Sequence, residues 1–518
     1  MILIVSQDLQ TINIQYESIL EKEQMAVSMK KFIRNAKFRA RGRWKGDVFF
    51  LYKNGTEAKI GMWHKIKGVC DKFGFPFKVY GLKAHVFHED ITEDEVRWFC
   101  MELMKGHPQI RTIRDRQISA VYKLVKFRYC LGNLATSAGK SLIIFLYIMF
   151  LRHKKLLNKV VLICHDADSV IQLHDEFVMY ANAKFKLYAA MVHGGTKVTD
   201  IRDHKIIIGN FQTLSNRPVE FFRDIDIVIA DEAQRATNDS IKYITESCGD
   251  TTHRIGVSGS LQEDDSADMW QLYERFGPVV CTVKKKELMD SGDATPIDIK
   301  VFILNWATEE QRKYLSNLRV AGKMTDIEML HIEQEMVRNS TGRMRWISGL
   351  VEKANGNMLV LFNDVKGGYG KRLVELFKSK NRNREVYYID GSVDAEMRDI
   401  IKKRMEDGKN KILVATYATY GTGKSIKNLH WIVCAESMKG YNIIAQGQGR
   451  GMRLHDDKSV YHWIDIVDDI SILDEVYNNR NYMMKQFDER LKLYKNDGFD
   501  FEIHRITITE SDTKEELF

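Results

Sequence analysis

The chain has 518 residues, of which 44% are hydrophobic and 29% are charged, with only 5 prolines. This length allows about three to four domains with substantial cores, which excludes a peptide, a single small module or a disulfide scaffold. The formal charge of +8 is unevenly distributed, because residues 31–83 hold 14 Lys and Arg against 3 Asp and Glu. Such a basic segment indicates a polyanionic partner.

The sequence also carries signals about location. The opening MILIVSQDLQ lacks the basic flank and long apolar core of a signal peptide. The longest apolar run, residues 142–151, is shorter than the roughly 20 residues that cross a bilayer. The 7 cysteines stand singly, which indicates neither a disulfide framework nor a zinc site. We therefore expect a protein of a reducing cytoplasm that does not bind membranes.

The first predicted element in chain order is a small α+β domain over residues 1–105, where aromatic and basic residues alternate around the turn signal YKNGTEAKI. In FRARGRWKGD three arginines occupy alternate positions, so an extended backbone would point them to one face. Phosphate contact with base stacking is one interpretation, and a solvated strand edge is the other. The candidate nucleic-acid-binding residues in this segment are Arg39, Arg41, Arg43, Trp44 and Lys45.

A candidate phosphate loop follows at residues 131–141, LGNLATSAGKS, before the apolar run LIIFLYIMF. Such a loop needs unobstructed backbone N–H groups, a helix N-terminus, a lysine and a hydroxyl. Leu134 stands where the full pattern has glycine, so an ordinary loop remains an alternative for this motif alone. The residues predicted to contact the nucleotide are Thr136, Ser137, Ala138, Gly139, Lys140 and Ser141.

Short β-branched runs recur over residues 160–258 with helix-like stretches between them, which predicts βαβ units and a parallel sheet. One run, IDIVIADEAQ, ends in Asp231 and Glu232. Because parallel strands end at one edge of a sheet, this pair can face the phosphate loop. Asp231 would hold Mg²⁺ together with Ser141, and Glu232 would orient or deprotonate the attacking water. A helix N-cap is the alternative role of the acidic pair.

A second series of strands over residues 358–467 predicts a second α/β block, and residues 308–353 are expected to be helical. The segment QGQGRGMR contains Gln446, Arg450 and Arg453. Two arginines three residues apart on a helix share one face, and they could reach a γ-phosphate from another domain. A solvated basic helix is the alternative.

In this order, ATSAGKS, DEAQ, SGS, ATYATYGTGKS and QGQGRGMR resemble motifs I, II, III, V and VI of superfamily-two helicases. With its basic aromatic N-terminal region, the chain more closely resembles UvsW-type phage helicases. The resemblance implies an α/β fold in which two RecA-like parallel-sheet motor domains follow a small α+β nucleic-acid-binding domain. The expected domains are residues 1–105, 106–300, 301–481 with a helical insertion near 308–353, and a C-terminal helix and strand at 482–518.

The resemblance also implies residue roles. Gln117 resembles an adenine-reading glutamine, with a surface glutamine as the alternative. Ser258 and Ser260 resemble a hydroxyl pair that couples hydrolysis to nucleic-acid binding, with helix capping as the alternative. Gln234 and the segment Cys164-His165-Asp166 depart from the family pattern, which usually has His and Pro-Thr there. The remaining positions carried over are Gly423 at the nucleotide, and Asn210, Gln212, Thr213, Thr416 and Thr419 at the nucleic-acid backbone.

The function implied is an ATP- and Mg²⁺-dependent DNA helicase or translocase that remodels Holliday junctions, stalled forks and R-loops in phage recombination, repair and replication. The expected partners are single-stranded, duplex and branched DNA, with RNA–DNA hybrids as further candidates, bound by a monomer in the host cytoplasm. An RNA helicase or strand-annealing motor is one alternative. A non-hydrolysing nucleic-acid-binding module is another, although the intact Lys140, Asp231 and Glu232 argue against it.

Overall fold

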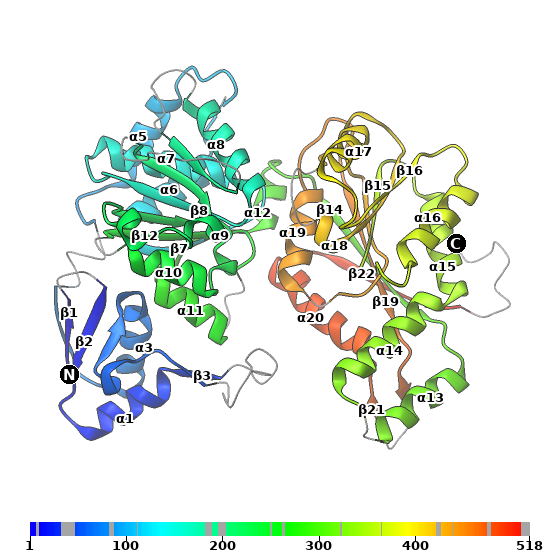
Figure 1. Cartoon of the computed structure of the whole chain (residues 1–518), viewed down its shortest axis with the longest axis horizontal. Coiled ribbons are helices and arrows are strands. Elements are labelled where there is room, and N and C mark those ends of the chain that lie inside the picture. Colours follow the sequence, from blue (N-terminus) through cyan, green and yellow to red (C-terminus); the bar gives the residue numbers. More distant parts are fainter. Residues whose placement is uncertain are drawn as a thin grey trace. The chain divides into compact units, whose positions relative to one another are not determined.

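The chain falls into two compact units, each described here by itself: unit 1 is Met1–Val283 and unit 2 is Lys284–Phe518 (Figure 1). The computed structural model describes residues 1–6, 10–32, 47–81, 88–110, 112–181, 189–194, 204–248, 251–261, 265–321, 324–363, 365–420, 426–438, 440–473 and 478–508. In these stretches no helix is long and apolar enough to cross a membrane.

Unit 1 begins with a small mixed sheet in the order β5-β2-β1-β6. Its strands are β1 (Ile2–Val5), β2 (Thr11–Gln15), β5 (Glu57–Lys59) and β6 (Lys78–Tyr80). Helices α1 (Ile19–Ser28) and α3 (Trp63–Phe73) accompany it. Leu3, Ile12 and Ile14 are buried, which is the alternation expected of strands with one covered face. The α+β fold predicted for this region is confirmed.

The core of this small sheet continues into the larger part of unit 1. Phe50 packs against Trp270 of α11 (Ala267–Phe276), with ring centroids 5.3 Å apart. Gly61 permits a close backbone approach, because a Cβ at this position would lie 2.2 Å from the carbonyl oxygen of Tyr273. The α+β region is therefore packed directly on α11.

The larger sheet of unit 1 has seven parallel strands in the order β13-β7-β12-β11-β8-β10-β9. They are β7 (Tyr129–Leu134), β8 (Val160–Cys164), β9 (Ala189–Val192), β10 (Ile206–Asn210), β11 (Ile227–Ala230), β12 (His253–Ser258) and β13 (Val279–Val283). Every residue of β8 and β11 is buried, as strands covered on both faces require. The other helices of unit 1 are α5 (Glu93–Met104), α6 (Asp115–Lys126), α7 (Lys140–His153), α8 (Ala167–Ala181), α9 (Phe211–Leu214) and α10 (Asp239–Ser247).

Unit 2 contains a second sheet of seven parallel strands, in the order β16-β17-β15-β18-β19-β14-β22. They are β14 (Ile297–Asn305), β15 (Met358–Phe362), β16 (Val386–Ile389), β17 (Ile412–Thr416), β18 (Trp431–Cys434), β19 (Tyr461–Asp468) and β22 (Phe501–Thr507). Between β19 and α20 in the chain, β20 (Ile472–Leu473) and β21 (Asn478–Asn479) form a short antiparallel pair. The predicted fold of two parallel-sheet domains is confirmed.

Helices of unit 2 include those predicted at residues 308–353, around QGQGRGMR and at the C-terminal end of the chain. They are α12 (Lys285–Asp290), α13 (Glu309–Val320), α14 (Asp326–Asn339), α15 (Thr341–Lys353), α16 (Tyr369–Lys380), α17 (Ala395–Asp407), α18 (Tyr417–Tyr420), α19 (Tyr441–Gly451) and α20 (Tyr482–Asn496). The side chains of Thr308, Thr325 and Ser340 accept backbone N–H groups at the starts of α13, α14 and α15, which accounts for three separate helices there.

The C-terminal helix and strand are part of the unit 2 core rather than an appendage. β22 pairs in parallel with β14 at the sheet edge. On α20, Arg490 is buried and its Nε donates to Asp465 Oδ2 of β19 at 2.8 Å. Tyr494 donates its hydroxyl to the same carboxylate oxygen at 2.7 Å. These buried bonds fix α20 to the sheet, because a buried carboxylate is costly without partners.

Candidate active site

The phosphate loop predicted at residues 131–141 joins the end of β7 to the start of α7. Gly139 stands before α7 with a left-handed φ of 82°, and Ser137 also has a positive φ of 74°. This left-handed φ favours glycine, and a Cβ on Gly139 would also lie 2.3 Å from Nε2 of Gln117 and displace that amide. The first N–H groups of α7 have no partner within the helix, which is the arrangement that binds phosphate.

The acidic pair after β11 meets this loop. Lys140 Nζ donates to Glu232 Oε1 at 3.0 Å, with the two side chains 17% and 27% exposed. Glu232 has a φ of 51°, a tight turn in which its own N–H donates to Asp231 Oδ1 at 2.9 Å. Only β12 separates β7 from β11 in the sheet. The two motifs, far apart in sequence, therefore lie at one sheet edge.

A hydrogen-bonded relay extends from Glu232 to the serine pair. Gln234 donates from Nε2 to Glu232 Oε2 at 2.6 Å and accepts the hydroxyl proton of Ser258 on Oε1. Ser258, at the end of β12, in turn accepts the N–H of Ser260 at 3.0 Å. The glutamine that departs from the family pattern thus joins the acidic pair to the serine pair.

The two carboxyl groups of the acidic pair differ in acidity. Burial raises the pKa of Asp231; Lys140 opposes this effect and Glu232 adds to it. Burial acts on Glu232 in the same direction, but Lys140 and Gln234 outweigh it and lower its pKa. Glu232 is therefore the carboxylate that holds its charge against Lys140, while the charge of Asp231 needs a further cation to stabilise it.

Oxygen donors suited to Mg²⁺ are present beside the loop. A hydroxyl, from Ser141, and a carboxylate, from Asp231, are oxygen ligands of the kind Mg²⁺ takes when phosphates and waters complete its shell. In the described part of the chain no three His, Cys, Asp or Glu residues cluster as a metal cage. Ser141 Oγ lies 2.9 Å from the hydroxyl oxygen of Tyr180 on α8. The residues present thus fit an ion held mainly by its nucleotide.

Gln117 is neither a surface residue nor distant from the loop. It lies on α6, is 9% exposed, and accepts the N–H of Arg114 on Oε1 at 3.0 Å. Its Nε2 donates to the carbonyl of Ala138 at 3.1 Å. The glutamine amide thus holds the phosphate loop itself, and the surface alternative is wrong. Its adenine-reading role stays a prediction.

The predicted arginines lie in unit 2, near the end of α19. Arg450 is in the last turn, and its guanidinium donates to the carbonyl of Tyr420 and lies 5.4 Å from that ring centroid. Arg453 follows the helix, because α19 ends at Gly451. The expectation that both arginines project from one helix is therefore wrong. The Gln446 side chain and the whole of Gly423 lie outside the described residues.

The predicted nucleic-acid contacts are placed unevenly. Asn210 Nδ2 donates to Gln212 Oε1 at 2.9 Å, just after β10, where Gln212 is exposed and Thr213 is half-buried. Thr416 is instead 5% exposed and its Oγ1 lies 2.8 Å from that of Thr419. Its hydroxyl is committed within unit 2 in this structure. The candidates Arg39, Arg41, Arg43, Trp44 and Lys45 lie outside the described residues.

Sequence reasoning missed Tyr180 and the bridging role of Gln234. Tyr180 has no sequence signal, because its link to Ser141 depends on how α8 packs on α7, where its ring lies 5.5 Å from that of Phe145. Gln234 was visible only as a departure from the family pattern. Its position two residues after Glu232 was the available signal.

Comparisons with known proteins agree with this geometry. Residues 110–263 match the family of the Type III restriction enzyme res subunit, and residues 342–455 match the helicase conserved C-terminal domain. The ATP-dependent DNA helicase uvsW of Enterobacteria phage T4 is 29% identical over 489 residues, which is 92% of this chain and 92% of that protein.

Two solved structures share the fold at low sequence identity. The ATP-dependent Type ISP restriction-modification enzyme LlaBIII bound to DNA is 14% identical with a TM-score of 0.54, covering 87% of this chain and 34% of its own. Dbp5 of S. cerevisiae bound to RNA and ADP BeF3 is 13% identical with a TM-score of 0.52, covering 80% and 95%. Taken with the loop, the acidic pair and the serine relay, the family and uvsW matches make this chain an ATP-dependent helicase of superfamily two.

Proposed function

We propose that this helicase is a DNA motor that uses ATP and Mg²⁺ to remodel branched DNA, including Holliday junctions, stalled forks and R-loops. The carrying observation is the unbroken set of hydrogen bonds from Lys140 through Glu232 and Gln234 to Ser258. DNA is favoured because the similar uvsW is named a DNA helicase. By the same similarity to a phage protein we propose that it acts in the host cytoplasm, in recombination, repair and replication. We further propose that it is a monomer.

The chemistry of the proposed site follows from its charges. Bound Mg²⁺ would supply charge neutralisation on the β and γ phosphates, held by Ser141 and Asp231. Lys140 would leave Glu232 for the phosphate oxygens, which it neutralises as the bond to the leaving phosphate breaks. Glu232, released from Lys140 and still ionised, would then accept a proton from the attacking water. The ion pair at 3.0 Å is thus a resting arrangement of the catalytic groups.

Unit 2 would complete hydrolysis with its arginines. Arg450 and Arg453 carry permanent charge, and a guanidinium stabilises the negative charge that grows on the transferring phosphoryl group. In this structure Arg450 is held by Tyr420, so we propose that it exchanges a carbonyl and a ring for phosphate oxygens. Gln446 and Gly423 stay candidates on the resemblance alone.

The described surface of unit 1 offers contacts for single strands. The ribbon of β3 (Lys30–Phe32) and β4 (Asp47–Phe49) turns Lys31 towards Trp270, with Nζ 4.3 Å from the ring centroid. Its other face carries Phe32 and Phe49, which are 60% and 58% exposed. Exposed aromatic rings beside lysines suit base stacking without sequence reading. We propose that this face, with Arg39, Arg41 and Arg43, binds DNA.

The test is steady-state ATP hydrolysis with no nucleic acid, single-stranded DNA, duplex DNA, a four-way junction or RNA. We expect the greatest stimulation with the junction. Lys140→Ala should abolish turnover yet leave junction binding measurable, and Glu232→Gln should do the same. Assays of strand separation on junction, fork and R-loop substrates then show which branched DNA the protein remodels.

Two outcomes would change the proposal. Stimulation by RNA alone would make the chain an RNA helicase, and stimulation by DNA without strand separation would make it an annealing motor or a translocase. Reversing charge at Arg39, Arg41 and Arg43 should flatten the salt dependence of DNA binding. An unchanged salt slope would favour the alternative, that this segment is a solvated strand edge that does not contact DNA.

A further inference from the structure

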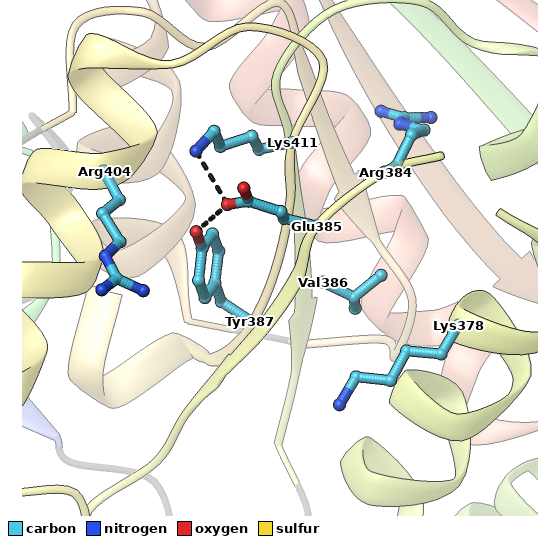
Figure 2. A pocket seen from close by; sticks show the side chains of 7 residues that line it. All are labelled: Lys378, Arg384, Glu385, Val386, Tyr387, Arg404 and Lys411. Atoms are coloured by element: carbon cyan, nitrogen blue, oxygen red, sulfur yellow. Dashed lines mark hydrogen bonds and ion pairs between the residues drawn. The ribbon is translucent and has the colours of Figure 1, made fainter. Parts of the chain in front are cut away.

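Unit 2 has a basic hollow at one edge of its sheet, and no residue of the ATYATYGTGKS and QGQGRGMR motifs lines it. The hollow has a volume of about 480 Å³ and is lined by Lys378, Arg384, Glu385, Val386, Tyr387, Arg404 and Lys411 (Figure 2). It lies where β16 and β17 begin, because residues 384–387 open β16 and Lys411 directly precedes β17. Thr416 lies at the opposite end of β17. The hollow is therefore at the sheet edge opposite the motif V end.

The charges of this hollow do not balance. Its lining has four cationic side chains and one carboxylate. Glu385 accepts Lys411 Nζ at 2.8 Å and the hydroxyl of Tyr387, and these bonds lower the pKa of Glu385. Arg384 donates to backbone carbonyls, including those of Val351 and Ala354 at 2.8 and 2.9 Å. The single carboxylate is thus already paired, and Arg384 is committed to the backbone.

Two cations remain for a ligand. Lys378 in the last turn of α16 and Arg404 in the last turn of α17 stand at opposite sides of β16 in Figure 2. Both are exposed; within the described residues neither side chain forms a hydrogen bond or an ion pair, and Arg404 acts on Glu385 only through its charge. Holding unpaired cations around one hollow costs free energy through mutual repulsion. An anion bound between them would remove that cost.

The cations continue beyond the hollow, which favours a polymer over a small anion. Lys378, Lys380 and Arg382 occupy alternate positions with no acidic residue between them, and all three are exposed. The lining has one aromatic ring, Tyr387, which lies 5.8 Å from Lys411 Nζ. A row of cations with few groups able to read bases is the pattern that binds a phosphate backbone irrespective of sequence.

We propose that this hollow is a second nucleic-acid site, which binds the phosphate backbone of a DNA arm outside the strand-tracking motifs. The inference rests on the proposed DNA function and deepens it. A motor that remodels a junction must hold more than one arm, and a backbone contact on unit 2 would move with that unit during the ATP cycle.

The experiment compares two variants of the full chain with equal charge change. The first carries Lys378→Glu and Arg404→Glu. The control carries Lys313→Glu and Lys492→Glu, two surface lysines of unit 2 that are each 67% exposed. Junction affinity is measured from 50 to 300 mM salt, with thermal melting to show that both variants fold.

The hollow variant should bind the junction about ten- to sixty-fold more weakly near 0.1 M salt, with a log–log salt slope shallower by about two, since each lost phosphate contact removes about 0.9. ATP turnover without nucleic acid should not change. Equal affinities and slopes for the two variants would overturn the site. The cations would then serve only to discourage the edge strand β16 from pairing with another chain. Binding of polyglutamate, abolished in the hollow variant while junction binding is kept, would also overturn it in favour of an acidic protein partner.

These outcomes are separable from failure of the proposed function. If the wild-type chain shows no DNA-stimulated ATP turnover, the DNA motor itself is refuted. If wild-type turnover is stimulated while the hollow variant matches the control, only the second site is refuted.

Discussion

Replacing Gln234 by alanine should slow ATP hydrolysis without preventing ATP binding. The amide donates to the ionised Glu232 at 2.6 Å and accepts from Ser258. A hydrogen bond to a charged group contributes about 1.5–3 kcal/mol, and each 1.4 kcal/mol is tenfold in rate. We therefore expect kcat to fall about 10- to 150-fold. KM for ATP should change by less than about threefold, because Lys140 and the loop are untouched.

The assay is ATP turnover with and without DNA, with two further variants as controls. Gln234→Glu keeps the side-chain size but places a second carboxylate against Glu232, so its loss of kcat should equal or exceed that of Gln234→Ala. Gln172→Ala removes a similar bond, from Nε2 to Glu176 Oε1 at 2.8 Å on the surface of α8, and should leave kcat unchanged. Near-normal kcat in Gln234→Glu would refute the reasoning, because no bridging donor to Glu232 would then be required.

Three further predictions follow from buried contacts. Arg343→Met should destabilise unit 2 by about 3–5 kcal/mol in urea unfolding, because the buried guanidinium donates to Asp468 at 2.6 Å; adding Asp468→Leu should restore only part of the loss, because Trp306 Nε1 also donates to Asp468 at 2.8 Å. Gly61→Ala should loosen the small sheet from Tyr273 and increase proteolysis between them, whereas unchanged cleavage would contradict the 2.2 Å clash. Lys285→Met removes a buried ammonium that joins α19 to the end of α20, so kcat should fall more than KM rises; equal effects would indicate general unfolding.

The fold could be predicted from the sequence where strands are apolar runs. VVLIC, MLVLF and ILVAT coincide with β8, β15 and β17, because a strand buried on both faces must be apolar throughout. The extent of the small domain around the first sheet could not be predicted as well. Its core is completed by Trp270, and no local pattern reveals a partner more than two hundred residues away.

The candidate site divides along the same line. Lys140, Ser141, Asp231 and Glu232 were predictable because phosphate and metal chemistry restrict residue type and spacing. The order of neighbouring strands was not, and it is this order that puts Ser258 within reach of Gln234. Arg453 shows the limit of helical spacing, since a periodicity argument cannot tell that α19 ends at Gly451.

The hydrogen bonds from Glu232 through Gln234 to Ser258 bear on how ATP hydrolysis could be coupled to nucleic-acid binding. A glutamine amide carries no charge at any working pH, so Gln234 cannot pass a proton between Glu232 and Ser258; it can pass only position. Glu232 and Ser258 lie at the ends of adjacent strands whose backbones are fixed by parallel pairing. In the mechanism we propose, Lys140 exchanges Glu232 for phosphate, and any shift of the Glu232 carboxylate then reaches the Ser258 hydroxyl through the Gln234 amide. The coupling we propose is thus geometric, and it depends on an amide of the right length rather than on a titrating group.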